Sequence, residues 1–197
     1  MLLDASLKRA TLFLGSKGKN TPLYILWQYV YLLISHLLLY RGRGLFVHAA
    51  GIRDRREGLL FVGPSGAGKS TIAKLFSRAE GASILCDDFM VICKEKRGPW
   101  LYGTPLLNAS FPPPSREGAP LRKIFFLRHG RKNVLKTVDP RDSLKRFLSE
   151  IPPILWVPEG LPFSATFSLD LCQRIPTYEL SFVPDETIVH FLRNAFD

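Results

Sequence analysis

Short apolar runs separated by polar turns dominate the middle of the chain, and they predict a β-hairpin that leads into a helix. The runs Leu45–Ile52 (LFVHAAGI) and Leu59–Val62 (LLFV) flank the polar stretch 53–58, which is typical of two paired strands. If Ile52 pairs with Leu59, the residue numbers of every pair sum to 111. The stretch 71–78 (TIAKLFSR) follows with helical spacing.

The rest of the chain mixes strand and helix patterns, which indicates the α/β class. Further strands are expected at 83–86, 89–93, 123–128 and 178–183. Further helices are expected at 139–150 and 186–196. Residues 108–120 hold four prolines and a glycine and predict a loop. We predict one domain, 1–197, with a mixed, twisted sheet and with residues 1–44 as a helical segment packed on the core.

The most apolar stretch, 23–40, spans 18 residues and allows two interpretations. Its length is near the lower limit for a membrane span, but Gln28, Ser35 and His36 interrupt it. A membrane anchor would lead directly into the next strand with little linker. We therefore favour a buried helix of a cytoplasmic protein over a membrane anchor.

The charge of the chain narrows the class of partner. Lys and Arg number 27 against 17 Asp and Glu, which gives a net charge of +10, and 46% of the residues are hydrophobic. This hydrophobic content excludes a disordered chain. A basic protein attracts phosphorylated ligands, nucleic acids or anionic membranes. No nucleic-acid recognition motif is visible, so we expect no nucleic-acid partner.

A glycine-rich motif directly after the second strand of the hairpin favours a phosphorylated ligand among these partners. The segment GPSGAGKS, residues 63–70, matches the Walker A pattern GxxxxGK[ST] of a phosphate-binding loop, or P-loop. Lys69 would reach the β- and γ-phosphates of ATP, and the hydroxyl of Ser70 would ligate Mg²⁺. The residues expected to bind the nucleotide are Gly63, Pro64, Ser65, Gly66, Ala67, Gly68, Lys69, Ser70 and Thr71.

Two carboxylates and a histidine complete the candidate site. Asp87 and Asp88 follow the next apolar strand, and the carboxyl ends of neighbouring strands meet at the ligand crevice of an α/β sheet. One aspartate can hold Mg²⁺ and the other can accept the proton of an attacking hydroxyl. In the predicted hairpin register His48 lies opposite Gly63. It could hydrogen-bond a phosphate oxygen or orient a carboxylate.

In this order, HAAGI with His48, the hairpin, GPSGAGKST and LCDD resemble the catalytic domain of HPr kinase/phosphorylase. That family shares its nucleotide-binding core with phosphoenolpyruvate carboxykinases. The resemblance implies that Ser70 and Asp87 organise Mg²⁺, that Asp88 is the general base towards a serine hydroxyl, and that His48 assists at the γ-phosphate. The chain departs from the family in having no acidic residue within 98–115, where a second metal-binding glutamate would be sought.

These residues predict an ATP-dependent kinase with His48, Lys69, Asp87 and Asp88 as catalytic residues. Its acceptor would be a hydroxyl, most plausibly that of a serine in a protein or peptide. Two alternatives stay open: a small-molecule P-loop kinase, and a non-catalytic ATP-binding sensor or scaffold protein. The sequence leaves the oligomeric state open as well, a homo-oligomer included.

Overall fold

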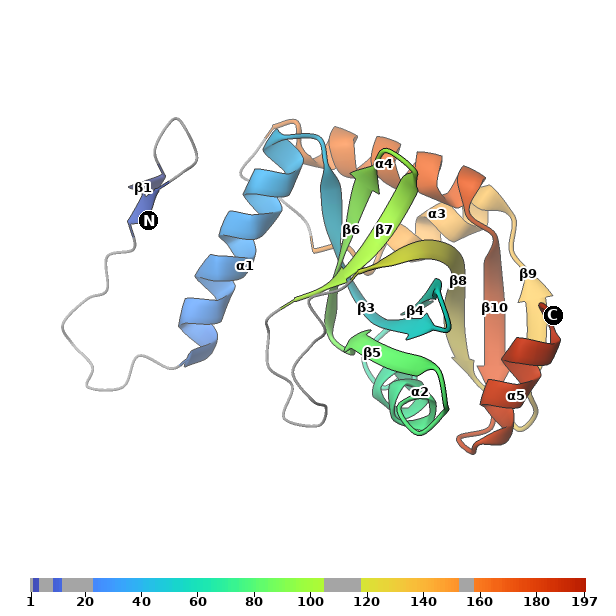
Figure 1. The fold of residues 1–197 in the computed structure, drawn as a ribbon. Helices are drawn as coiled ribbons and strands as arrows, with labels where there is room; N and C mark the ends of the chain where they lie inside the picture. The colour runs from blue at the N-terminus through green and yellow to red at the C-terminus, as the bar shows by residue number, and fades with distance from the viewer. Residues whose placement is uncertain (1, 4–8, 12–22, 105–117, 153–157) are drawn as a thin grey trace.

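The fold was analysed in a computed structural model that describes residues 2–3, 9–11, 23–104, 118–152 and 158–197. It is a mixed α/β structure, with helices on both faces of a curved sheet (Figure 1). The main sheet has eight strands: β3 (Gly44–Asp54), β4 (Glu57–Val62), β5 (Ala82–Cys86), β6 (Phe89–Glu95), β7 (Gly98–Gly103), β8 (Ala119–His129), β9 (Val134–Thr137) and β10 (Thr177–Phe182). A separate antiparallel pair is formed by β1 (Leu2–Leu3) and β2 (Ala10–Thr11).

The helices are α1 (Leu23–Tyr40), α2 (Lys69–Phe76), α3 (Pro140–Leu148), α4 (Gly160–Arg174) and α5 (Thr187–Asn194). The predicted helix at 23–40 is confirmed as α1, and those at 71–78, 139–150 and 186–196 are confirmed as α2, α3 and α5, with shifted ends. The start of α3 follows the expected capping chemistry. The carboxylate of Asp139 accepts hydrogen bonds from the backbone N–H groups of Arg141 at 2.9 Å and Asp142 at 3.2 Å.

The hairpin of β3 and β4 has the predicted register. Its pairs run from Ala49 with Val62 to Asp54 with Glu57, so the residue numbers of each pair sum to 111. The connection is shorter than expected, because both strands continue to a turn at Arg55, which has a φ of 56°. The last part of β3 also pairs with β5, and this additional ladder keeps residues 53–54 extended.

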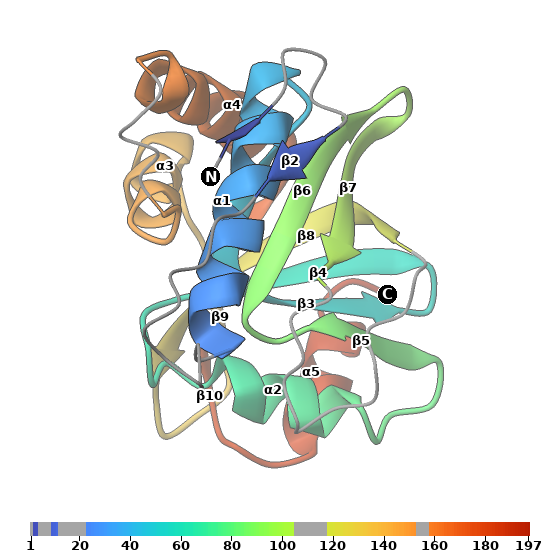
Figure 2. The same ribbon diagram turned by 90° about the vertical axis from the view of Figure 1, so that its left-hand side faces the viewer.

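Two long strands, β3 and β8, connect the whole sheet. The first half of β3 pairs with β6 and its second half with β5, while β8 pairs with β7, β4 and β10. The pairings therefore close a ring from β3 through β6, β7, β8 and β4 back to β3 (Figure 2). The pairs β4–β8 and β8–β10 are parallel and the others antiparallel, which confirms the predicted mixed sheet.

The alternation of side chains along β4 builds a separate apolar core on each face of the sheet. Leu60 and Val62 belong to a cluster that includes residues of α3 and α4. Leu59 and Phe61 belong to a second cluster, which includes residues of α2 and α5. Successive side chains of a strand point to opposite faces, so a continuous apolar run such as LLFV suits a strand that is covered on both sides.

Helix α1 lies against β3 and contributes to the first of these clusters. The ring of Tyr31 lies 4.9 Å from that of Phe46, and Leu39 is buried in the core. Among the residues that the structure describes, no helix is long and apolar enough to cross a membrane. Most of the loop predicted at 108–120, residues 108–117, lies outside the described residues.

Helix α4 and strand β9 are among the elements that were not predicted. Helix α4 carries Pro162 near its start and follows prolines at 152, 153 and 158, which obscure its helical pattern in the sequence. Proline is tolerated in the first turn of a helix because the N–H that it lacks would have no partner there. Strand β9 is four residues long and mostly exposed, so its apolar pattern is too weak to indicate a strand.

A partly buried ion pair fastens α5 to the hairpin and gives a test of the fold. Arg193 donates to both carboxylate oxygens of Asp54, at 2.6 and 3.1 Å, and also to the carbonyl of Glu80 at 2.8 Å. We expect Asp54→Asn to lower the free energy of unfolding by about 2–4 kcal/mol, because it leaves the Arg193 guanidinium without its counter-charge. Denaturant titration monitored by circular dichroism measures this loss.

The exposed pair of Arg55 and Asp197, 3.2 Å apart, provides the control. Arg55→Gln should cost less than about 1 kcal/mol, because water screens an exposed pair. Equal losses in the two variants would contradict the structural role given to Asp54.

Candidate functional site

The residues of the Walker A match form a tight loop between β4 and α2. Gly66 and Gly68 have φ angles of 82° and 101°, in the left-handed region that glycine adopts readily. The first hydrogen bond within α2 runs from the N–H of Ile72 to the carbonyl of Gly68 at 2.9 Å. The N–H groups of residues 69–71 therefore have no partner within the helix, and such groups at a helix start can hydrogen-bond an anion.

This glycine loop, residues 63–68, is packed closely against strands β8 and β10. A Cβ atom added at Gly68 would lie 2.9 Å from the Phe182 ring of β10. One added at Gly63 would lie 3.0 Å from the Cβ of Ala67 and 3.5 Å from that of Leu127 in β8. Gly68 is thus required by a close contact as well as by its backbone angles.

Lys69 turns back over the loop that precedes it. Its Nζ atom donates to the carbonyl oxygens of Gly63 and Pro64, the latter at 3.0 Å, and the residue is only 6% exposed. Burial lowers the pKa of Lys69, and the nearby carboxylates of Glu150 and Asp88 act in the opposite direction. A buried cation therefore lies beside two carboxylates at the end of β4.

Asp87 and Asp88 occupy the bend between β5 and β6, on the other side of β3 from β4. Asp87 is 4% exposed, whereas the side chain of Asp88 is 50% exposed. The carbonyl of Asp88 accepts a hydrogen bond from the N–H of Ala49 at 3.1 Å, which holds this bend against β3. The two aspartates thus differ in environment, with Asp87 buried and the side chain of Asp88 half exposed.

His48 lies between two carboxylates. Its Nε2 atom is 3.5 Å from Oδ1 of Asp88, and its Nδ1 atom is 3.4 Å from Oε2 of Glu150. The backbone N–H of His48 also donates to the carbonyl of Glu150 at 2.8 Å. Ala49 is the last paired residue of the hairpin on this side, so His48 occupies the next position, as the predicted register required.

Glu150 is the member of the site that the sequence did not indicate. It lies just after α3, its side chain is 11% exposed, and the following Ile151 is buried in the core. Glu150 thus adds a third carboxylate to those of Asp87 and Asp88. Its only signal in the sequence is a position at the end of a predicted helix, and no spacing relates it to His48 or Lys69.

We refer to His48, Lys69, Asp87, Asp88 and Glu150 as the carboxylate–histidine cluster. Within the described part of the chain, no group of three or more His, Cys, Asp or Glu residues could hold a metal ion by itself. Mg²⁺ does not need such a cage, because it keeps several water ligands and binds through one or two carboxylates together with phosphate oxygens. The oxygen atoms of Ser70 and Asp87 are the type of ligand that this ion prefers.

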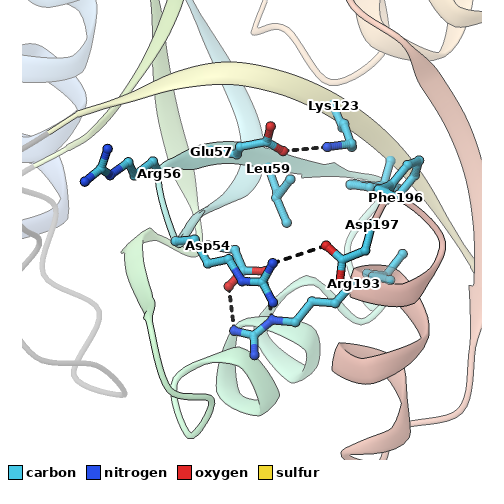
Figure 3. Close-up of a pocket in the computed structure, with 11 residues that line it drawn as sticks. Asp54, Arg56, Glu57, Leu59, Lys123, Arg193, Phe196 and Asp197 are labelled. Atoms are coloured by element: carbon cyan, nitrogen blue, oxygen red, sulfur yellow. Dashed lines mark hydrogen bonds and ion pairs between the residues drawn. The ribbon is translucent and has the colours of Figure 1, made fainter.

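A cavity of about 370 Å³ lies at the opposite end of β4, beside the hairpin turn and α5 (Figure 3). Its charged side chains are largely paired, as Asp54 with Arg193, Arg55 with Asp197, and Glu57 with Lys123. None of the residues predicted for the candidate site lines it. We therefore assign this cavity to the attachment of α5 and not to the candidate site.

Comparison with solved structures gives a distant likeness. No family model matches the chain, and no curated protein matches it. The structure is similar to that of the Hpr(Ser) kinase/phosphatase from Coxiella burnetii, with a TM-score of 0.44 and 15% sequence identity. The match covers 76% of this chain and 91% of that chain. A similarity at this level concerns only the path of the chain and says nothing about substrate or residues.

The close contact at Gly68 gives a test of the glycine loop. Gly68→Ala should lower the free energy of unfolding by about 2–3 kcal/mol, because the added methyl combines left-handed backbone strain with a clash against Phe182. Gly66→Ala is the matched control, since it has a similar backbone strain but nothing within 4 Å of the added Cβ. It should cost about 1 kcal/mol.

Thermal or denaturant unfolding of the two variants measures the difference. Equal losses at the two positions would show that Phe182 does not support the loop.

Proposed function

We propose that this protein is an ATP-dependent kinase that transfers the γ-phosphate to a hydroxyl group, most plausibly that of a serine in a protein or peptide. One observation carries the proposal. A Walker A loop with an inward-turned lysine lies next to a histidine that is held between two carboxylates. Phosphoryl transfer requires such a combination of phosphate positioning, charge neutralisation and a proton acceptor.

The glycine loop and the start of α2 are proposed to bind the phosphates of ATP. The unpaired N–H groups of residues 69–71 would donate to phosphate oxygens, and Lys69 would exchange its two carbonyl partners for the β- and γ-phosphates. This exchange places a buried positive charge where negative charge develops during transfer. Ser70 and Asp87 would hold Mg²⁺, which neutralises charge on the phosphates when it is bound.

Asp88 is proposed as the proton acceptor because its carboxylate is half exposed and can meet a substrate hydroxyl. The serine oxygen would attack the γ-phosphorus while Asp88 takes its proton, and the bond from the γ-phosphorus to the bridging oxygen would break to release ADP. Of the two roles considered for His48, its position favours orienting Asp88. Glu150 would fix the imidazole from the other side.

The first prediction concerns ATP binding. Lys69→Ala should reduce ATP turnover by about 10²–10³-fold and weaken ATP binding, because it removes the cation beside the phosphates. Lys74→Ala is the matched control, since Lys74 is an exposed lysine on the same helix. It should bind and turn over ATP like the unaltered protein. Isothermal titration calorimetry measures binding, and release of labelled phosphate measures turnover.

The second prediction concerns the transfer step. The assay uses Mg²⁺, γ-labelled ATP and a panel of serine peptides. Asp88→Asn should still bind ATP, but its transfer rate should be about 10²–10⁴-fold lower, because asparagine cannot accept the proton. Asp142→Asn, at an exposed position on α3, is the control. Full transfer by Asp88→Asn would exclude Asp88 as the base. ATP binding by the unaltered protein without transfer or hydrolysis would favour a sensor or scaffold instead.

A further inference from the structure

Half of the net charge of the protein lies in one short segment. Residues 128–146 contain seven Lys and Arg and two Asp, which gives +5 of the total of +10. All seven of these cationic residues are exposed. We refer to five of them as the basic surface: Arg128, Arg131, Lys132, Lys136 and Arg146.

The basic surface begins at the same edge of the sheet as the glycine loop. Strand β8 is parallel to β4, with Phe126 opposite Val62. Arg128 therefore lies near the end of β8, two residues beyond the one paired with the last residue of β4, at the edge of the sheet where the glycine loop begins. The next residues are anchored by Asn133, which donates to Thr187 Oγ1 at 3.0 Å and accepts from the N–H of Val183 at 2.8 Å. The connection to β9 is thereby fixed beside the candidate site.

The basic surface is poorly neutralised by the protein itself. Glu179 is 3.5 Å from Arg128 and 2.7 Å from Arg146, and it lies opposite Lys136 in the β9–β10 ladder. A hydrogen bond from Arg146 lowers the pKa of Glu179, so this carboxylate stays charged. One carboxylate thus faces three cations. In the described part of the chain, Arg131, Lys132 and Lys136 have no carboxylate within ion-pair distance.

A cavity gives this surface a shape that can receive a ligand. Its volume is about 280 Å³, and it is lined by Arg128, His129, Val134, Lys136, Glu179 and Ser181. Val134 is 38% exposed and adds an apolar contact among the charges. This combination of charged and apolar lining residues suits a side chain of a bound polypeptide better than a freely hydrated ion.

Helix α3 connects the basic surface to the carboxylate–histidine cluster. Arg146 lies in its last turn and covers the ring of Phe126, and Glu150, one turn further along the chain, contacts His48. A segment bound along the basic surface would therefore have a neighbouring residue close to His48 and Asp88. This is the location that an acceptor hydroxyl must reach.

We propose that the basic surface binds an acidic polypeptide segment next to the acceptor serine. The inference rests on the proposed kinase function and specifies its substrate class. ATP already has the glycine loop for its phosphates. Single-stranded nucleic acids are usually held by exposed aromatic rings as well as cations, and residues 128–146 contain no Phe, Tyr or Trp.

The test compares two serine peptides that differ only in having Glu and Asp or Gln and Asn around the acceptor. The unaltered protein should have a lower KM for the acidic peptide, and this preference should weaken as salt is raised. The triple variant Arg131→Ala/Lys132→Ala/Lys136→Ala should raise the KM for the acidic peptide about ten-fold, because three unpaired cations are removed. Its KM for ATP should not change.

The control variant Arg56→Ala/Lys96→Ala/Arg97→Ala removes the same charge from exposed positions in two other turns. An equal rise in the KM for the acidic peptide in this variant would show that the effect comes from the overall charge of the protein, and it would overturn the proposal. The proposal would also fail if the triple variant changed the KM for ATP alone. Tighter binding of a single-stranded oligonucleotide than of the acidic peptide, lost in the triple variant, would overturn it in favour of nucleic acid.

Failure of the proposed function gives a different result. If the unaltered protein transfers no phosphate, the kinase proposal fails, and fluorescence anisotropy of the labelled acidic peptide still tests the surface. Binding that is lost in the triple variant and kept in the control would support the basic surface. If phosphate is transferred equally well to both peptides, the kinase proposal stands and the inference about the basic surface is wrong.

Discussion

The backbone ladder of β3 is the constraint on which the candidate site depends. This strand pairs with β4 on one side and with β5 and β6 on the other. It therefore fixes the glycine loop that follows β4 relative to the aspartates at the bend between β5 and β6, and it carries His48 between them. A slip by one residue would turn His48 to the opposite face of the sheet, because side chains alternate along a strand. The two-residue turn at 55–56 resists such a slip, because turn length fixes the register of a hairpin.

The electrostatics of the site follow from this arrangement. A buried lysine is costly unless opposite charges and hydrogen-bond acceptors surround it. The carbonyls of Gly63 and Pro64 supply acceptors, and the carboxylates of Asp88 and Glu150 supply charge. In the absence of a ligand the lysine is thus stabilised by its own loop. A polyanion such as a triphosphate would offer it stronger partners, so the fold keeps a cation in position without a large structural change.

The charged residues of the candidate site and of the basic surface lie at one edge of the sheet. The glycine loop and the basic surface lie at the same edge of the sheet, since β4, β8 and β10 are parallel. The same edge thus presents exposed cations and the carboxylates that contact His48, which is a charge distribution that suits the proposed function.

The local parts of this protein follow directly from its sequence. The register of the hairpin, the capped start of α3 and the glycine motif depend on neighbouring residues or short loops, and these patterns can be read directly. Proline obscured α4, and the short exposed β9 left no clear pattern. The placement of Glu150 and the closure of the strands into a ring were decided only by the tertiary structure. Glu150 is 102 residues from His48 in the chain, and packing of Ile151 in the core together with one backbone hydrogen bond brings them together. Contacts between residues so far apart leave no periodic signal, because they are set by how whole elements pack.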